Sequence, residues 1–94
     1  MSKVTHATEL QILIVDDHAI VREGLKRILE SSGKHMMVSE ASSGAQALEM
    51  LSRQRIDLMI IDLSMPGMSG LDLIKRVSGV MFFSKLGWTK CRER

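Results

Sequence analysis

Three aspartates directly follow two short apolar runs, and their type and placement suit them to chemistry. Asp16 and Asp17 follow the run that ends at Val15, and Asp62 follows the run that ends at Ile61. If these runs form neighbouring parallel strands, about 4.8 Å apart, the three carboxylates converge at one edge of a sheet. Three negative charges so close together raise one another's pKa unless a cation lies between them. The pattern therefore favours a hard divalent cation with oxygen ligands, above all Mg²⁺.

A carboxylate screened by a cation can also act as a nucleophile. One of these aspartates can then attack a phosphorus atom and become an acyl phosphate. The structural alternative is that acids at strand ends only cap helices and keep loops solvated. For a single aspartate, a role in such a site and a role in capping or solvation are equally favoured. Two adjacent aspartates after one buried run, and a third after another, favour the site.

The segments around these aspartates alternate between strand-like and helix-like patterns. Residues 11–15, with an apolar run over residues 12–15, and residues 58–61 are typical of strands buried on both faces, and residues 36–41 form a weaker strand pattern. Residues 19–30 carry apolar side chains at helical spacing, namely Ile20, Val21, Leu25, Ile28 and Leu29. This alternation predicts an α/β fold with an open parallel sheet and right-handed crossovers.

Two more helices are predicted, one after the second strand and one after the third. Ser43 and Gln46 have the spacing of a capping box, and the helix that they begin ends near Gln54. The side chains of this helix that we expect to face the core are Ala45, Leu48 and Leu51. Ser69 and Asp72 can cap a third helix, whose apolar side chains are Leu71, Ile74 and Val77.

Length and composition exclude several classes of protein. Ninety-four residues make one domain at most, and 45% hydrophobic residues exclude a disordered chain. With 3% aromatic residues, extensive stacking on nucleic-acid bases is not expected. The single cysteine, Cys91, cannot form an internal disulfide, and no apolar run exceeds four residues. We therefore expect a cytoplasmic protein without a signal peptide or a membrane span.

The character of the chain changes near Val77. Residues 1–78 have a net charge of −1, whereas residues 79–94 have a net charge of +3 and hold both Phe residues and the only Trp. We expect a partial domain over residues 10–78, an atypical basic tail over residues 79–94 and a disordered segment over residues 1–9. Val80 to Phe83 fits either a fourth strand or a cover for the face of a short sheet. Residues 87–94 show no period and no recognition-helix pattern, so we expect no direct binding of nucleic acid.

The motifs around the aspartates resemble the signature segments of bacterial response-regulator receiver domains. These segments are residues 12–18 (ILIVDDH) and 62–70 (DLSMPGMSG), and the resemblance extends from about Leu10 to Val77. The Asp-Asp-His variant followed by residues 21–25 (VREGL) is similar to the subfamily that carries a C-terminal helix-turn-helix domain. The resemblance implies a flavodoxin-like receiver fold, here incomplete, with strand order 2-1-3.

The same resemblance implies a function and a set of site residues. The chain would be the phospho-accepting module of a two-component response regulator, and not an enzyme, with a sensor histidine kinase as its partner. Asp62 would be the phospho-acceptor. Asp17 and Asp62 would bind Mg²⁺ through their carboxylates, Asp16 mainly through water, and Ser64 through its backbone carbonyl. Pro66 and Gly70 would shape the following loop, Gly70 through its backbone freedom.

Two parts of the family's site have no clear counterpart in this sequence. They are a Ser or Thr after the fourth strand and a Lys after the fifth. Ser84 follows an apolar run but comes early, and Thr89 is better spaced but lacks such a run; Lys85 and Lys90 are weaker candidates for the lysine. The simpler interpretation is a solvated basic tail, produced by truncation, by a reading-frame shift or as a deliberate short form. We therefore expect impaired switching.

Three strands alone would leave the third strand with an exposed edge. Such an edge favours a homodimer or a swapped oligomer. Two other functions stay open: an interaction module that binds a kinase or partner without switching, and a Mg²⁺-dependent phosphohydrolase of the haloacid-dehalogenase type. The second needs Asp-x-Asp, whereas Ser64 follows Asp62 at that spacing. For His18, a loop contact is a more common role than metal binding.

Overall fold

The computed structural model describes residues 9–32, 35–63, 65, 67, 70–77, 80–84 and 87–90. Strands and helices alternate over these residues in the order β1 (Leu10–Val15), α1 (Ala19–Glu30), β2 (Met36–Ala41), α2 (Gly44–Arg53), β3 (Leu58–Ile61), α3 (Gly70–Arg76), β4 (Met81–Ser84) and β5 (Gly87–Lys90). Several predictions lie outside the described residues: the disorder of residues 1–8, the Ser69 cap and any role of Cys91.

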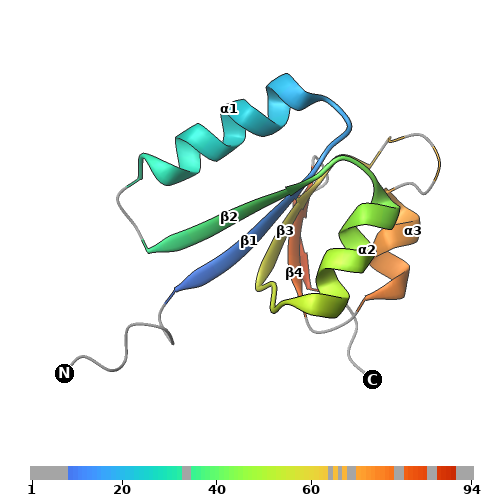
Figure 1. The fold of residues 1–94 in the computed structure, drawn as a ribbon. Helices are drawn as coiled ribbons and strands as arrows, with labels where there is room; N and C mark the ends of the chain where they lie inside the picture. The colour runs from blue at the N-terminus through green and yellow to red at the C-terminus, as the bar shows by residue number, and fades with distance from the viewer. Residues whose placement is uncertain are drawn as a thin grey trace.

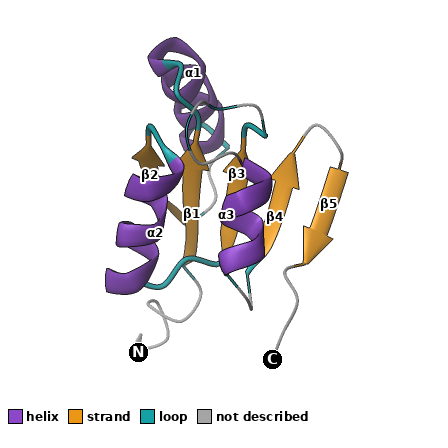
Figure 2. Cartoon of the chain, turned by 90° about the vertical axis from the view of Figure 1, so that its right-hand side faces the viewer, coloured by secondary structure: helices purple, strands orange, loops and turns teal. Residues whose placement is uncertain are grey.

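The strands form one sheet in the order β2-β1-β3-β4-β5. The first four are parallel, and β5 runs antiparallel to β4 (Figure 2). Helix α1 lies on one face of the sheet, and α2 and α3 lie on the other (Figure 1). The predicted order 2-1-3 and the parallel direction are therefore confirmed.

The expectation that the third strand is left at an open edge is wrong. Strand β4 pairs with β3 in parallel, with Met59 opposite Phe82. Of the two interpretations of Val80 to Phe83, the fourth strand is the one that the structure shows. Phe82 and Ser84 are buried while Met81 and Phe83 are exposed, which is the alternation of a strand with one covered face. Strand β5 was not predicted, because its four residues (GWTK) carry no alternation of apolar and polar side chains.

The main core lies between the sheet and helices α2 and α3. Leu13 and Met59 from the sheet and Leu73 from α3 are fully buried in it. The predicted phase of α2 is partly wrong, since Ala45 is exposed and Ala47 is fully buried. Leu48 and Leu51 pack against the core, with partly buried Ile74 and Val77.

The predicted cap of α2 is present in a modified form. Ser43 Oγ accepts the Gln46 amide at 3.1 Å, as expected. Gln46 Oε1 accepts the amide of Ser42 at 2.7 Å, one residue earlier than in a standard capping box. This arrangement fixes the turn between β2 and α2.

Helix α1 is only loosely covered. It packs on β1 and β2, above Ile12 and Ile14, yet none of its own residues is buried. Its predicted apolar stripe is therefore largely open to solvent. We use the name α1-side surface for five exposed apolar residues of α1 and β4, which are Ile20 (84% exposed), Val21 (44%), Ile28 (67%), Met81 (38%) and Phe83 (37%). No helix within the described residues is long and apolar enough to cross a bilayer.

Candidate functional site

The sheet brings the carboxyl ends of β1 and β3 together. Val15, the last residue of β1, pairs with Ile61, the last residue of β3. The Asp62 amide then donates to the Val15 carbonyl at 2.9 Å, and the Asp16 amide donates to the Ala41 carbonyl at 3.1 Å. These backbone bonds continue the strand pairing by one residue, so Asp16 and Asp62 lie side by side at the edge.

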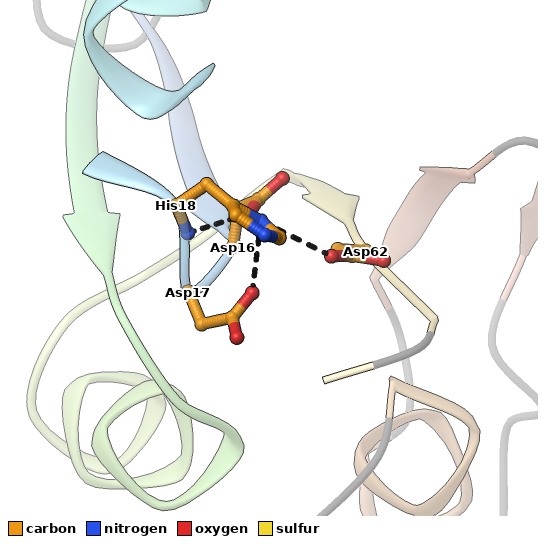
Figure 3. Close-up of side chains that lie close together, drawn as sticks. All are labelled: Asp16, Asp17, His18 and Asp62. Atoms are coloured by element: carbon orange, nitrogen blue, oxygen red, sulfur yellow. Dashed lines mark hydrogen bonds and ion pairs between the residues drawn. The ribbon is translucent and has the colours of Figure 1, made fainter. Parts of the chain in front are cut away.

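Four side chains meet at this edge, namely those of Asp16, Asp17, His18 and Asp62 (Figure 3). One ligand atom from each lies within 4.8 Å of all the others. The side chains of Asp16 and Asp62 are 13% and 16% exposed, and that of Asp17 is 31% exposed. The structure thus brings together the three aspartates that the sequence singled out. Their packed negative charge suits a small divalent cation.

His18 is a member of this cluster that the sequence analysis treated as a loop contact. Its Nδ1 lies 2.8 Å from Asp16 Oδ1, 3.0 Å from Asp17 Oδ1 and 3.9 Å from Asp62 Oδ2. The hydrogen bond with Asp16 and the charge of Asp17 raise the pKa of His18 above its usual value of 6.5. The sequence feature that could have assigned His18 to this cluster is its position directly after two aspartates at the end of a strand.

Arg22 is a second residue whose part in the site the sequence did not reveal. From the first turns of α1, its Nη1 donates to the Asp16 carbonyl at 2.7 Å, and its Nε donates to Glu40 Oε1 at 3.0 Å. The Arg22 side chain is 17% exposed. Arg22 therefore ties the turn that carries Asp16 to strand β2. It lies inside the VREGL motif, which carried the resemblance but had no assigned role.

The loop after Asp62 passes close to the start of α3. A Cβ atom on Gly70 would lie 2.7 Å from the Ile61 side chain, 2.8 Å from the Asp62 carbonyl and 2.8 Å from Leu63 Cα. Gly70 is thus needed for this close approach, not for the backbone freedom that we expected. A positive φ, of 75°, occurs instead at Gly67. Ser64 and Pro66 lie outside the described residues.

Because β5 is antiparallel to β4, the residues that could supply the missing hydroxyl and ammonium group lie at different distances from the edge that holds the aspartates. Ser84 is the last residue of β4, is buried, and lies at the same edge as Asp62. Thr89 pairs with Phe82 inside the hairpin, and Lys90 pairs with Met81 at the far end of β4. Of the two hydroxyl residues, only Ser84 lies at the edge that holds the aspartates. Lys85 is outside the described residues.

Comparison with known protein families gives a match over most of the chain. Residues 12–81 match the family described as response regulator receiver domain. The nitrate/nitrite response regulator protein NarP of Escherichia coli is 44% identical over 68 residues, which cover 72% of this chain and 32% of NarP. The transcriptional regulatory protein YdfI of Bacillus subtilis is 42% identical, covering 71% of this chain and 32% of YdfI. The chain thus spans about a third of the length of these relatives.

Solved structures show the same fold. A receiver domain protein from Methanospirillum hungatei has a TM-score of 0.73 and 27% identity, covering 92% of this chain and 72% of that one. The response regulator protein TrrA of Thermotoga maritima, solved in complex with Mg²⁺-BeF, has a TM-score of 0.64 and 38% identity. That likeness covers 69% of this chain and 55% of TrrA.

Proposed function

Because the chain belongs to the response regulator receiver domain family, we propose that Asp62 accepts a phosphoryl group from a sensor histidine kinase. The observation that carries the proposal is the convergence of the Asp62 carboxylate with Asp16 and Asp17 at the carboxyl edge of the sheet. An Asp62 oxygen would attack phosphorus, and the bond between phosphorus and its donor would break. The chain then acts as the phospho-accepting module of a two-component system, and not as an enzyme.

The proposed cofactor of this reaction is Mg²⁺. Asp17 and Asp62 would bind it through carboxylate oxygens, Asp16 mainly through water, and Ser64 through its carbonyl. When bound, the cation would neutralise charge on the phosphoryl oxygens. The acidic cluster and the Mg²⁺-BeF complex of the TrrA relative support this assignment.

We also propose that phosphorylation and switching are uncoupled in this chain. Strand β5 places Lys90 opposite Met81, at the end of β4 away from Asp62. Lys90 thus lies about 10 Å along the strands from the edge that holds Asp62, and we propose that it does not neutralise a phosphate there. On addition of a beryllium or aluminium fluoride, we expect amide NMR shifts near Asp16, Asp62 and Ser84. Shifts that extended to Lys90 with a change of oligomeric state would contradict this.

Two further parts of the proposal concern the setting of the protein. We propose that the chain works in the cytoplasm, where its kinase would reach it, without direct binding of nucleic acid. We also propose that it forms a homodimer or a swapped oligomer. The exposed α1-side surface supports self-association.

A phosphotransfer assay tests the function directly. The full chain is incubated with Mg²⁺ and a small phosphodonor such as acetyl phosphate, and intact mass is measured. We expect one phosphoryl adduct on the wild type and none on Asp62→Asn. The matched control is Asp57→Asn, at the opposite end of β3, which should still be labelled. Equal labelling of Asp62→Asn and wild type would refute Asp62 as the acceptor.

A further inference from the structure

His18 places a nitrogen donor inside the aspartate cluster, and this donor is not used to begin α1. His18 is the N-cap residue of the helix, a position that usually holds a Ser, Thr, Asp or Asn bonded to an amide of the first turn. The His18 side chain makes no such bond. Its ring lies among the carboxylates instead (Figure 3).

The distances from His18 Nδ1 to the carboxylate oxygens lie in the range found between ligands of a single metal ion. An octahedral ion with bonds of about 2.1 Å holds adjacent ligand atoms about 3.0 Å apart and opposite ones about 4.2 Å apart. His18 Nδ1 lies 2.8 Å from an Asp16 oxygen, 3.0 Å from an Asp17 oxygen and 3.9 Å from an Asp62 oxygen. The distances from Nδ1 to the Asp17 and Asp62 oxygens therefore suit ligands of one ion, and the contact with Asp16, a hydrogen bond in the metal-free chain, leaves Asp16 to act through water.

The backbone of His18 is fixed while its ring stays accessible. Its amide donates to Asp16 Oδ1 at 2.8 Å, and its carbonyl accepts the Arg22 amide at 3.1 Å. Its side chain is 66% exposed, so an ion can enter from solvent. A ligand on a fixed backbone loses little conformational entropy when it binds.

We propose that His18 Nδ1 is a ligand of the divalent cation and shifts the preference of the site from Mg²⁺ toward transition metals such as Co²⁺. The proposal rests on the cation site of the proposed function. Sites of carboxylates and water suit Mg²⁺, whereas an imidazole nitrogen favours later first-row ions. The three aspartates alone would give a magnesium site, and His18 makes it a mixed nitrogen and oxygen site.

The test compares two ions on two histidine variants of the full chain. Mg²⁺ and Co²⁺ are titrated separately at about pH 8, where an ordinary imidazole is mostly neutral. Affinity is measured by calorimetry, and the Co²⁺ absorption spectrum reports nitrogen ligation. The variant is His18→Gln, and the matched control is His35→Gln, an exposed histidine before β2 at the other end of the sheet. Circular dichroism checks that each variant is folded.

We expect wild type and His35→Gln to bind Co²⁺ at least about 10-fold more tightly than Mg²⁺. His18→Gln should lose about 10-fold in Co²⁺ affinity and less than about 3-fold in Mg²⁺ affinity. Equal changes for both ions would overturn the proposal. Tighter binding of both ions by His18→Gln would also overturn the proposal, and would show that the positive charge of His18 competes with the cation. If neither ion binds wild type, the proposed cation site fails as well; Mg²⁺ binding without the Co²⁺ preference overturns only the role of His18.

Discussion

At the scale of single residues, the site is governed by the charge of three carboxylates around one imidazole. Because Asp16 and Asp17 hold the pKa of His18 above its usual value, protonation of the ring stabilises the folded chain in the absence of metal. A raised pKa means that this stabilisation is complete at pH values below about 6.5. It is then lost as the pH rises through the folded-state pKa.

The corresponding prediction concerns the titration of His18. In Asp17→Asn, the pKa of His18 should fall toward its usual value, because one negative charge is removed. The measurement is a histidine NMR titration without metal, with Asp57→Asn as a control that leaves the pKa of His18 unchanged. In thermal denaturation, the difference in stability between wild type and His18→Gln should shrink as the pH rises. If this difference in stability grew as the pH rose, protonated His18 would not stabilise the folded chain and the prediction would be wrong.

At the scale of elements, the position of Asp62 depends on how closely α3 approaches the end of β3. Gly70 makes that approach possible, since any side chain there meets the backbone of Asp62 and Leu63. Helix α1 contains a contrasting glycine, Gly24, whose added Cβ would meet nothing within 4 Å. Replacing each glycine by alanine therefore separates two effects on stability. Gly70 reports steric crowding together with helix propensity, and Gly24 reports helix propensity alone.

We predict that Gly70→Ala destabilises the fold by about 1–3 kcal/mol, the usual cost of overpacking. It should also slow phosphorylation, because the loop that carries Asp62 has to move. Gly24→Ala should stabilise the chain by about 0.5–1 kcal/mol, since alanine favours a helix more than glycine does. Chemical denaturation and the mass assay measure both effects. If the two variants were equally stable, steric contact at Gly70 would not be the reason for the glycine.

The elements also show how far sequence could predict this structure. The continuous apolar runs of β1 and β3 are strong local signals, and with Asp16, Asp17 and Asp62 they predicted the three-aspartate edge. Strand β5 has no such signal, because its existence depends on pairing with β4. The phase of α2 was missed at Ala45 since alanine fits either face of a helix. The ring of His18 is placed by tertiary contacts that adjacency in sequence only hints at.

At the scale of the whole molecule, the two faces of the sheet are covered unequally. Helices α2 and α3 bury Leu13, Met59 and Phe82 on one face. On the other face, within the part of the chain that the structure describes, α1 packs on β1 and β2 and the α1-side surface is exposed. Both helix and sheet residues contribute to that surface, and a dimer with a two-fold axis through it would bury the same residues of both copies.

The last prediction is that the chain associates with itself through this surface. In sedimentation velocity at increasing concentration, wild type should form a dimer or a larger species, because burial of the exposed isoleucines removes apolar area from water. The double variant Ile20→Gln with Ile28→Gln should be mainly monomeric, while staying folded, since both side chains are largely exposed in the monomer. The control is Ala45→Gln, an exposed position on α2 at the opposite face, which should associate like wild type. A compact wild-type monomer with a sharp cooperative melt would contradict the prediction, and the exposed isoleucines of α1 would then be stable in water without a partner.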